Sequence, residues 1–301
     1  MTRRDQPRLL TPPREEEEIY PYRRVWPSIM IETGVLFVIT MSLYIMVGYL
    51  RLRPPESLNR PVNTLVALSP ALLWMVFSLW RERTVPEPRP KLIGVFVISA
   101  LVANAVGVPT VTALKTEQWL PFLGIIGRII GYAVTVGIVQ ELLKYLVVRY
   151  TVWPGALRIR LDAVAYCAAA AIGYATALNL HFAFGPVSSP DIVALRVFSN
   201  ATIHLSAGVL LAYGLAETRF NPRSFLIMPV ALLVAAGVVG LAISARSSLI
   251  NAKFFLGVSA IRPIFGFGFS LMVISGALAV AIFLFHVAER GEREAIAGHT
   301  G

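Results

Sequence analysis

Cysteine, histidine and charged side chains are all scarce in this chain of 301 residues. There is one cysteine, Cys167, and there are four histidines, of which His299 lies near the C-terminal end. A single cysteine excludes an intrachain disulfide framework and any metal site built from several thiolates. A metal site in this chain would therefore need carboxylate ligands beside histidine.

Charged residues make up 15% of the chain, whereas hydrophobic residues make up 56% and the mean hydropathy is +0.68. Soluble domains carry about 25% charged residues, so this composition indicates a helical membrane protein in contact with a lipid bilayer. The net charge of +10 is typical of Lys and Arg in cytoplasmic loops. We expect no nucleic-acid partner, because the basic residues form no patch interleaved with aromatic residues.

Eight apolar segments follow the polar residues 1–27, and each has close to the roughly 20 residues needed to cross a bilayer. The predicted spans are 28–50, 63–80, 92–112, 121–148, 162–184, 192–216, 225–244 and 263–287. The second span is short, and we expect Pro70 to kink it. The stretch 245–262 mixes Phe and Leu with basic residues, which predicts an amphipathic segment in the membrane interface.

The expected fold is all-α, a polytopic transmembrane helical bundle of about eight spans with the fourth, fifth and sixth at its core. The predicted membrane domain covers 28–288, between polar tails at 1–27 and 289–301. The acidic run Glu15–Glu18 predicts a solvated segment or a short helix. With the N terminus inside, 17 Lys and Arg lie on the inner side and 7 on the outer side. This bias predicts a multi-pass protein of the cell membrane with both termini in the cytoplasm.

Polar side chains interrupt the fourth span at Gln140-Glu141-Leu142-Leu143-Lys144. A carboxylate in the bilayer core is costly unless it is paired, and Lys144 lies three residues further on, on the same helix face. One interpretation is an ion pair between Glu141 and Lys144 that only fixes helix packing. The other makes Glu141 a general base or a metal ligand, with its protonation tuned by Lys144.

The fifth span carries a second group of polar residues. Asp162, at its start, predicts a cap of the helix N terminus. The small residues Ala168–Ala171 and Gly173 predict the close approach of another helix. Asn179 and His181 are two positions apart, so they point in different directions around the helix and do not face one centre. Near the outer end of the span, His181 is either an interfacial histidine or a ligand.

The sixth span carries polar or small residues at every fourth position, namely Arg196, Asn200, His204 and Gly208. This spacing predicts one polar stripe along a single helix face. His204 is either a structural histidine or part of a functional site. A rise of about 1.5 Å per residue places His204 roughly 18 Å and Glu141 roughly 12 Å from the inner surface, whereas Asn179 lies about 25 Å deep. Glu141 and His204 are therefore candidates for one site, and Asn179 fits that layer poorly.

In order and spacing, these residues resemble the PrsW family of intramembrane proteases, which is grouped with the type II CAAX prenyl proteases and the Aph-1 subunit of gamma-secretase. The family pattern is Glu-Glu-x-x-Lys on one helix, then Asp-Gly-x-x-Tyr and Gly-Phe-Ala-x-x-Glu-Asn on the next, then an Arg and a His. The matching residues are Glu141, Lys144, Asp162, Tyr166, Gly173, Tyr174, Ala175, Asn179, Arg196 and His204. The resemblance covers about 130–215, within a PrsW-like core of about 121–216.

The resemblance implies a hydrolase of a bacterial inner membrane, an intramembrane metalloprotease that cleaves a membrane-anchored protein substrate. It implies catalytic roles for Glu141, Lys144 and His204, and a divalent metal such as zinc held by Glu141, His204 and His181. Supporting roles follow for the other polar residues of these helices: Gln140, Asp162, Tyr166, Asn179, Arg196 and Asn200.

The sequence departs from the family pattern at two carboxylates. Gln140 stands where the first Glu belongs, and Leu178 stands where the Glu of Glu-Asn belongs. Glutamine can hold the geometry of glutamate but cannot accept a proton, and leucine can do neither. An alternative is therefore a catalytically inactive scaffold, or partner subunit of a membrane complex, as Aph-1 is. A third class is a transporter or channel that uses the stripe of the sixth span, although paired discontinuous segments or inverted halves are not evident.

Overall fold

A computed structural model of the chain describes residues 25–84, 88–185, 189–221, 225–251 and 263–299. Within these ranges the protein is helical and has no strand, which confirms the all-α prediction. Eight of the described helices are long and apolar enough to cross a membrane, as predicted. They are Val25–Tyr49, Glu56–Arg83, Leu92–Ala113, Ile125–Thr151, Arg160–Ala183, Pro190–Phe220, Ile227–Ala245 and Phe265–Ala288. The acidic run Glu15–Glu18 lies outside the described residues.

The first four spans each join α-helix to a π-helical stretch. They are α1 (Val25–Leu43) with η2 (Tyr44–Tyr49); α2 (Glu56–Trp74) with η3 (Met75–Leu79) and α3 (Trp80–Arg83); α4 (Leu92–Val102) with η4 (Ala103–Gly107) and α5 (Val108–Ala113); and α7 (Ile125–Tyr132) with η6 (Ala133–Gly137) and α8 (Ile138–Thr151). The short helix α6 (Thr116–Trp119) and the 3-10 turn η5 (Leu120–Phe122) precede α7. π-Helical stretches occur frequently at functional sites, and η6 leads directly into α8, which carries Gln140 and Glu141.

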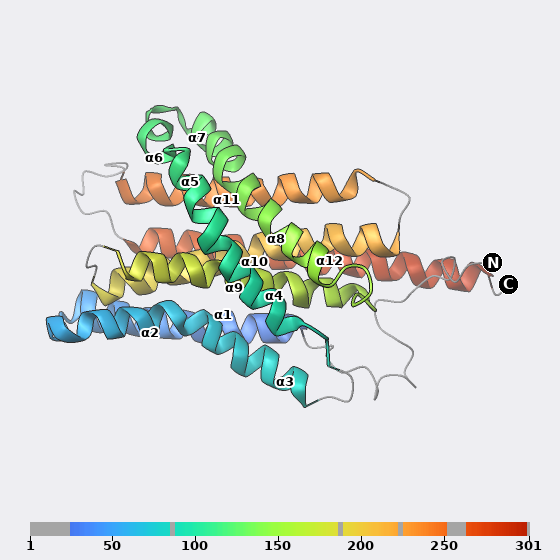
Figure 1. The fold of residues 1–301 in the computed structure, drawn as a ribbon, viewed down its shortest axis with the longest axis horizontal. Coiled ribbons are helices and arrows are strands. Elements are labelled where there is room, and N and C mark those ends of the chain that lie inside the picture. The colour runs from blue at the N-terminus through green and yellow to red at the C-terminus, as the bar shows by residue number, and fades with distance from the viewer. Residues whose placement is uncertain (1–24, 85–87, 186–188, 222–224, 252–262, 300–301) are drawn as a thin grey trace.

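The last four spans are single helices: α9 (Arg160–Ala183), α10 (Pro190–Phe220), α11 (Ile227–Asn251) and α12 (Pro263–His299). In α9 and α10, 94% and 89% of the apolar window is buried, so these two helices form the centre of the bundle. α10 packs against α9, α11 and α12, whereas α9 also contacts α2 and α4. The continuous α4–α5 and α7–α8 helices run diagonally across the others (Figure 1).

The structure differs from the predicted arrangement at the fourth span. Only 28% of its apolar window is buried, so this span lies at the periphery and the core is formed by the fifth and sixth spans. Its apolar side chains at Ile126, Ile130 and Val134 are exposed, as suits a helix with one face toward lipid. Gln140 and Glu141 are buried instead, because the polar face of the helix packs inward.

The second span is also longer than predicted. It extends from Glu56 to Arg83, because the polar residues before position 63 continue the same helix. The α-helix runs through Pro70 to Trp74 and then passes into η3. In the stretch 245–262, residues up to Asn251 continue α11, and the remainder of the predicted interfacial segment lies outside the described residues.

Small residues let the central helices approach closely, as predicted. A Cβ atom added at Gly173 of α9 would lie 2.2 Å from the carbonyl oxygen of Phe96 in α4. At Gly208 of α10, an added Cβ would lie 3.1 Å from the carbonyl oxygen of Cys167 and 3.0 Å from the Cβ of Ala171, both in α9. Backbones this close allow short side chains of different helices to meet, which is the usual role of small residues in membrane bundles.

Candidate functional site

Glu141, Lys144 and His204 form a buried polar centre between α8 and α10. Glu141 and Lys144 lie one turn apart on α8, with 2.7 Å between the Glu141 Oε1 and Lys144 Nζ atoms. The ammonium group also lies 3.4 Å from Nδ1 and 3.5 Å from the backbone oxygen of His204 on α10. The structure therefore brings the three predicted catalytic residues into one continuous set of contacts.

This centre is completely withdrawn from solvent. Glu141 is 0% exposed, Lys144 is 1% exposed and His204 is 3% exposed. Burying two opposite charges is costly, and it is offset only when they meet each other with good geometry. Lys144 therefore provides the counter-charge of Glu141 inside the bundle, and removal of either side chain would leave the other buried without its partner.

Several polar atoms around the centre lack a hydrogen-bond partner among the described residues. They include Oε2 of Glu141, Oε1 of Gln140 and the hydroxyl of Tyr174. The Tyr174 ring lies 5.3 Å from the His204 ring, so Tyr174 belongs to the same centre. Sequence reasoning treated Tyr174 only as part of a family motif. The sequence signal for a role beyond packing was the polar hydroxyl of Tyr174 in the middle of an Ala-rich, apolar span.

The polar stripe of α10 is satisfied by neighbouring helices along its length. Nδ2 of Asn200 donates to Oδ1 of Asn179 at 3.0 Å, and this pair joins α10 to α9. The Arg196 guanidinium lies 4.0 Å from the centroid of the Phe182 ring, also on α9. Asn179, which fitted the Glu141 layer poorly, thus has its own partner in a different layer of the bundle.

Asp162 and Tyr166 are supporting residues at the beginning of α9, away from the centre. Oδ2 of Asp162 accepts hydrogen bonds from the backbone N–H groups of Arg158 at 2.7 Å and Ile159 at 2.9 Å. The predicted capping role is therefore confirmed, with Asp162 at the third helical position and reaching back to the N-cap residue Ile159. The Tyr166 hydroxyl donates to the carbonyl oxygen of Pro90 at 2.9 Å.

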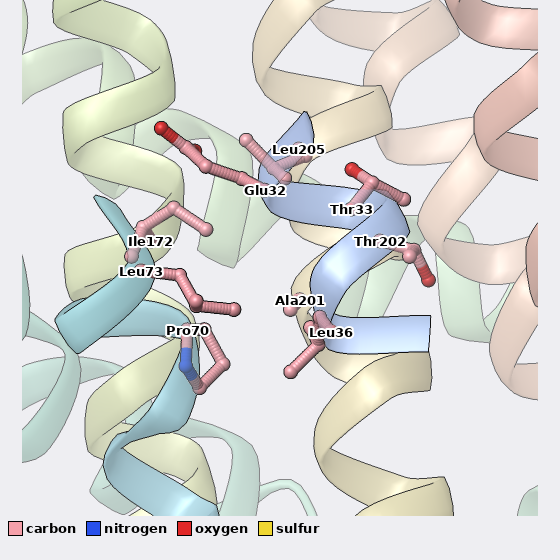
Figure 2. Close-up of a pocket in the computed structure, with 9 residues that line it drawn as sticks. All are labelled: Glu32, Thr33, Leu36, Pro70, Leu73, Ile172, Ala201, Thr202 and Leu205. Carbon is pink, nitrogen blue, oxygen red and sulfur yellow. The ribbon is translucent and has the colours of Figure 1, made fainter. Parts of the chain in front are cut away.

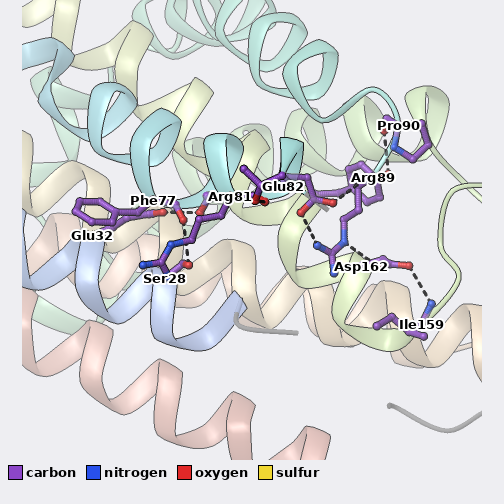
Figure 3. Close-up of polar contacts among 12 residues, drawn as sticks. Ser28, Glu32, Phe77, Arg81, Glu82, Arg89, Pro90, Ile159 and Asp162 are labelled. Carbon is purple, nitrogen blue, oxygen red and sulfur yellow. Dashed lines mark hydrogen bonds and ion pairs between the residues drawn. The ribbon is translucent and has the colours of Figure 1, made fainter. Parts of the chain in front are cut away.

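Two charged residues that sequence reasoning missed complete this capping network (Figure 3). Nε of Arg89 lies 2.6 Å from Oδ1 of Asp162, and its Nη1 lies 2.8 Å from Oε2 of Glu82. All three side chains are at least 98% buried. The network ties the loop after α3 to the start of α9. No spacing pattern connects Glu82 and Arg89 with Asp162, so the sequence carried no direct signal of this contact.

A second buried carboxylate, Glu32 of α1, was also missed. It is 5% exposed and accepts a hydrogen bond from the Ser78 hydroxyl of η3. Glu32 borders a cavity of about 10 Å³, across which Pro70 and Leu73 of α2 face Leu36 and Ala201 (Figure 2). A lone acid within an apolar span is a functional candidate by itself, so this residue was detectable from the sequence.

His181 lies apart from the polar centre. It is exposed and borders an apolar groove of about 570 Å³ between α2, α4 and α9, together with Asn104 and Thr176. Among the described residues, no three His, Cys, Asp or Glu side chains lie close enough to hold one metal ion. Glu141 and His204 instead share the ammonium group of Lys144. The arrangement therefore does not fit the three-ligand zinc site expected from Glu141, His204 and His181.

The family of the chain follows from comparison with known proteins. Residues 87–241 match the model of the PrsW family of intramembrane metalloproteases. The match covers more than half of the 301 residues and includes the polar centre, Arg89 and Asp162 of the capping network, and α9–α10. No curated protein and no solved structure gives a significant match. With eight helices able to cross a membrane among its described residues, the chain is a multi-pass membrane protein that belongs to the PrsW family of intramembrane metalloproteases.

Proposed function

We propose that this protein is an intramembrane endopeptidase that hydrolyses a peptide bond of a membrane-anchored protein. The observation that carries the proposal is the contact of Lys144 with both Glu141 and His204, because it places a buried carboxylate, its counter-charge and an imidazole together. Membership of the PrsW family supports the same activity. Glu141 is the base, and Lys144 and His204 orient and stabilise it.

The reaction uses the carboxylate of Glu141 to activate water. As the water oxygen attacks the scissile carbonyl carbon, its proton passes to Glu141, which is the role of a general base. The proton then passes to the amide nitrogen of the leaving chain, and the carbon–nitrogen bond breaks. The Lys144 ammonium counters the charge of Glu141 before the attack and after the proton has left. Because the centre is buried, substrate binding must separate helices around it.

The family is described as metalloproteases, and metal analysis tests whether this protein binds a metal ion at the polar centre. Glu141 and His204 are the two side chains at the centre able to bind a divalent cation such as zinc, and in this structure both contact the Lys144 ammonium group instead. Purified protein should be analysed for metal beside Glu141→Ala and His204→Ala variants. Stoichiometric metal that both variants lose would place it at this centre. A folded sample without metal would overturn a metalloprotease activity and favour the inactive scaffold.

The activity can be tested without a known substrate. N-terminal peptides of membrane proteins are compared by mass spectrometry in cells that carry wild-type protein or Glu141→Gln. New N termini inside or beside membrane segments should decrease about 100-fold or more in Glu141→Gln, since a general base contributes at least this factor. Glu217→Gln is the matched control, because it alters another buried carboxylate of a spanning helix, outside the polar centre. Identical N termini with wild type and Glu141→Gln would contradict the proposal.

The second candidate is a catalytically inactive scaffold or partner subunit of a membrane complex. The observation that favours it is the state of Gln140, which occupies the place of a carboxylate and has its Oε1 atom without a hydrogen-bond partner among the described residues. Under this alternative, Glu141→Gln leaves the N termini unchanged, while a stable membrane protein copurifies with the wild-type chain in fixed ratio.

We also propose the placement of the protein in a cell membrane. The eight helices able to span it require both chain ends to lie on one side, and the excess of Lys and Arg assigns that side to the cytoplasm. The membrane domain then covers 28–288, with its PrsW-like core at 121–216 and polar tails at 1–27 and 289–301. Cysteine accessibility at the two ends, measured in intact cells and in opened cells, tests this orientation.

A further inference from the structure

The hydroxyl of Tyr174 is buried without a hydrogen-bond partner among the described residues. Tyr174 is 0% exposed on α9. The other deeply buried tyrosine of this helix, Tyr166, donates its hydroxyl to the backbone oxygen of Pro90. Buried hydroxyl groups are nearly always hydrogen-bonded, since an unmet donor is destabilising. A phenylalanine would fill the same space in α9 without the free-energy cost of an unpaired hydroxyl group. We therefore expect the hydroxyl to have a hydrogen-bond partner such as a bound ligand or water.

The fold makes room for this hydroxyl at one particular glycine. A Cβ atom added at Gly107 would lie 2.0 Å from the Tyr174 hydroxyl oxygen and 2.9 Å from its ring. Gly107 is the last residue of the π-helical stretch η4, which packs against both α8 and α9. The missing side chain of Gly107 therefore accommodates the phenol, and the hydroxyl lies at the junction of η4, α8 and α9.

Acceptors without partners lie on the α8 side of this junction. Oε2 of Glu141 and Oε1 of Gln140 have no hydrogen-bond partner among the described residues. Glu141 is joined to His204 through Lys144, and the Tyr174 ring lies 5.3 Å from the His204 ring. A buried donor and two buried acceptors, none with a hydrogen-bond partner among the described residues, therefore lie on helices that meet at this junction. Buried water molecules bridge such groups, with two to four polar partners.

We infer that Tyr174 is a positioning residue that donates a hydrogen bond to a water molecule bound by the carboxylate of Glu141. Its hydroxyl holds the water oxygen, while one water proton points to Oε2 of Glu141. If the proposed peptidase function holds, this water is the nucleophile, and Tyr174 aims it during attack. The binding of the water itself stands independently of that function.

The spectroscopic test isolates the one phenol. Infrared spectra of protein with isotope-labelled tyrosine rings are recorded for wild type and Tyr174→Phe, and their difference is the C–O band of Tyr174. We expect the band of a hydrogen-bond donor, shifted when Glu141→Gln changes the partner of the water. Tyr166→Phe gives the matched reference, because the Tyr166 band should not respond to Glu141→Gln. A free-hydroxyl band, or a donor band unaffected by Glu141→Gln, overturns the inference.

The kinetic test uses a peptide that carries the cleavage site found by N-terminal mass spectrometry. We expect Tyr174→Phe to lower kcat about 10-fold with an unchanged KM, because the ring packing on His204 is retained and only the aim of the water is lost. Tyr213→Phe, which removes a hydroxyl of α10 outside the polar centre and the capping network, should leave kcat unchanged. Equal losses in both variants, or none in Tyr174→Phe, overturn the positioning role. If wild type cleaves nothing, the peptidase proposal fails, and the infrared result still decides whether the water is bound.

Discussion

Lys144 and His204 are separated by 60 residues in the sequence, and their side-chain nitrogens Nζ and Nδ1 lie 3.4 Å apart. This contact joins the peripheral α8 helix to the buried α10 helix. It depends on the length of the lysine side chain, which turns inward to Glu141 and His204 and is 1% exposed. The polar centre is thus built by a helix that otherwise presents apolar side chains to lipid.

Replacement of Lys144 by Met should be strongly destabilising. It leaves the Glu141 carboxylate buried without its counter-charge, and breaking a buried pair in this way costs about 3–5 kcal/mol. The measurement is the free energy of unfolding in mixed detergent micelles, titrated with a denaturing detergent. The double variant Glu141→Gln and Lys144→Met removes both charges and should recover most of the loss. Equal stability of the single and double variants would contradict a direct ion pair.

Replacement of Arg89 by Met should loosen the start of α9. Glu82 and Asp162 would lose their shared buried cation, with an expected loss of about 3–5 kcal/mol in unfolding free energy. Limited proteolysis of the loop before α4 should become faster at the same time. The exposed Arg83 offers a control, since Arg83→Met removes the same charge from the end of α3, next to this loop. Similar effects of the two variants would show that the network in Figure 3 is not the cause.

The Glu32–Ser78 contact predicts different outcomes for two conservative changes. Glu32→Gln keeps an oxygen acceptor for the Ser78 hydroxyl and should change the unfolding free energy by less than about 1 kcal/mol. Ser78→Ala removes the donor and leaves the Glu32 side chain without this bond, which should cost about 1–3 kcal/mol. Thermal unfolding in detergent measures which of the two variants loses more stability. A larger loss in Glu32→Gln than in Ser78→Ala would mean that Glu32 has a charged role.

The closeness of α4 and α9 predicts that Gly173 does not tolerate a side chain. Gly173→Ala places its Cβ 2.2 Å from the carbonyl oxygen of Phe96, so the helices must separate. Overpacking of this kind costs about 1–3 kcal/mol. Gly237→Ala on α11 is the matched control, because nothing lies within 4 Å of its added Cβ. It should be neutral or stabilising by up to about 1 kcal/mol, through helix propensity. Unfolding free energies of both variants decide the comparison.

Hydrophobic length by itself determined that the described chain forms eight helices able to span a membrane. A segment of about 20 apolar residues has few alternatives to a spanning helix, because the bilayer core offers no partner for open backbone groups. Local spacing also identified Glu141 with Lys144 and the cap at Asp162, since residues three positions apart share a helix face. In the same way, the order of polar motifs predicted the family match that residues 87–241 confirmed.

Only the tertiary structure decided which polar residues meet. Periodicity within one helix contains no information on the rotation and depth of neighbouring helices. It therefore did not distinguish the two histidines: His204 contacts Lys144, whereas His181 borders a groove. The peripheral position of α8 and the use of Gly107 to house the Tyr174 hydroxyl depend on backbone distances between helices. Such distances are set by side-chain packing across the whole bundle, which is physical information that no single segment of sequence contains.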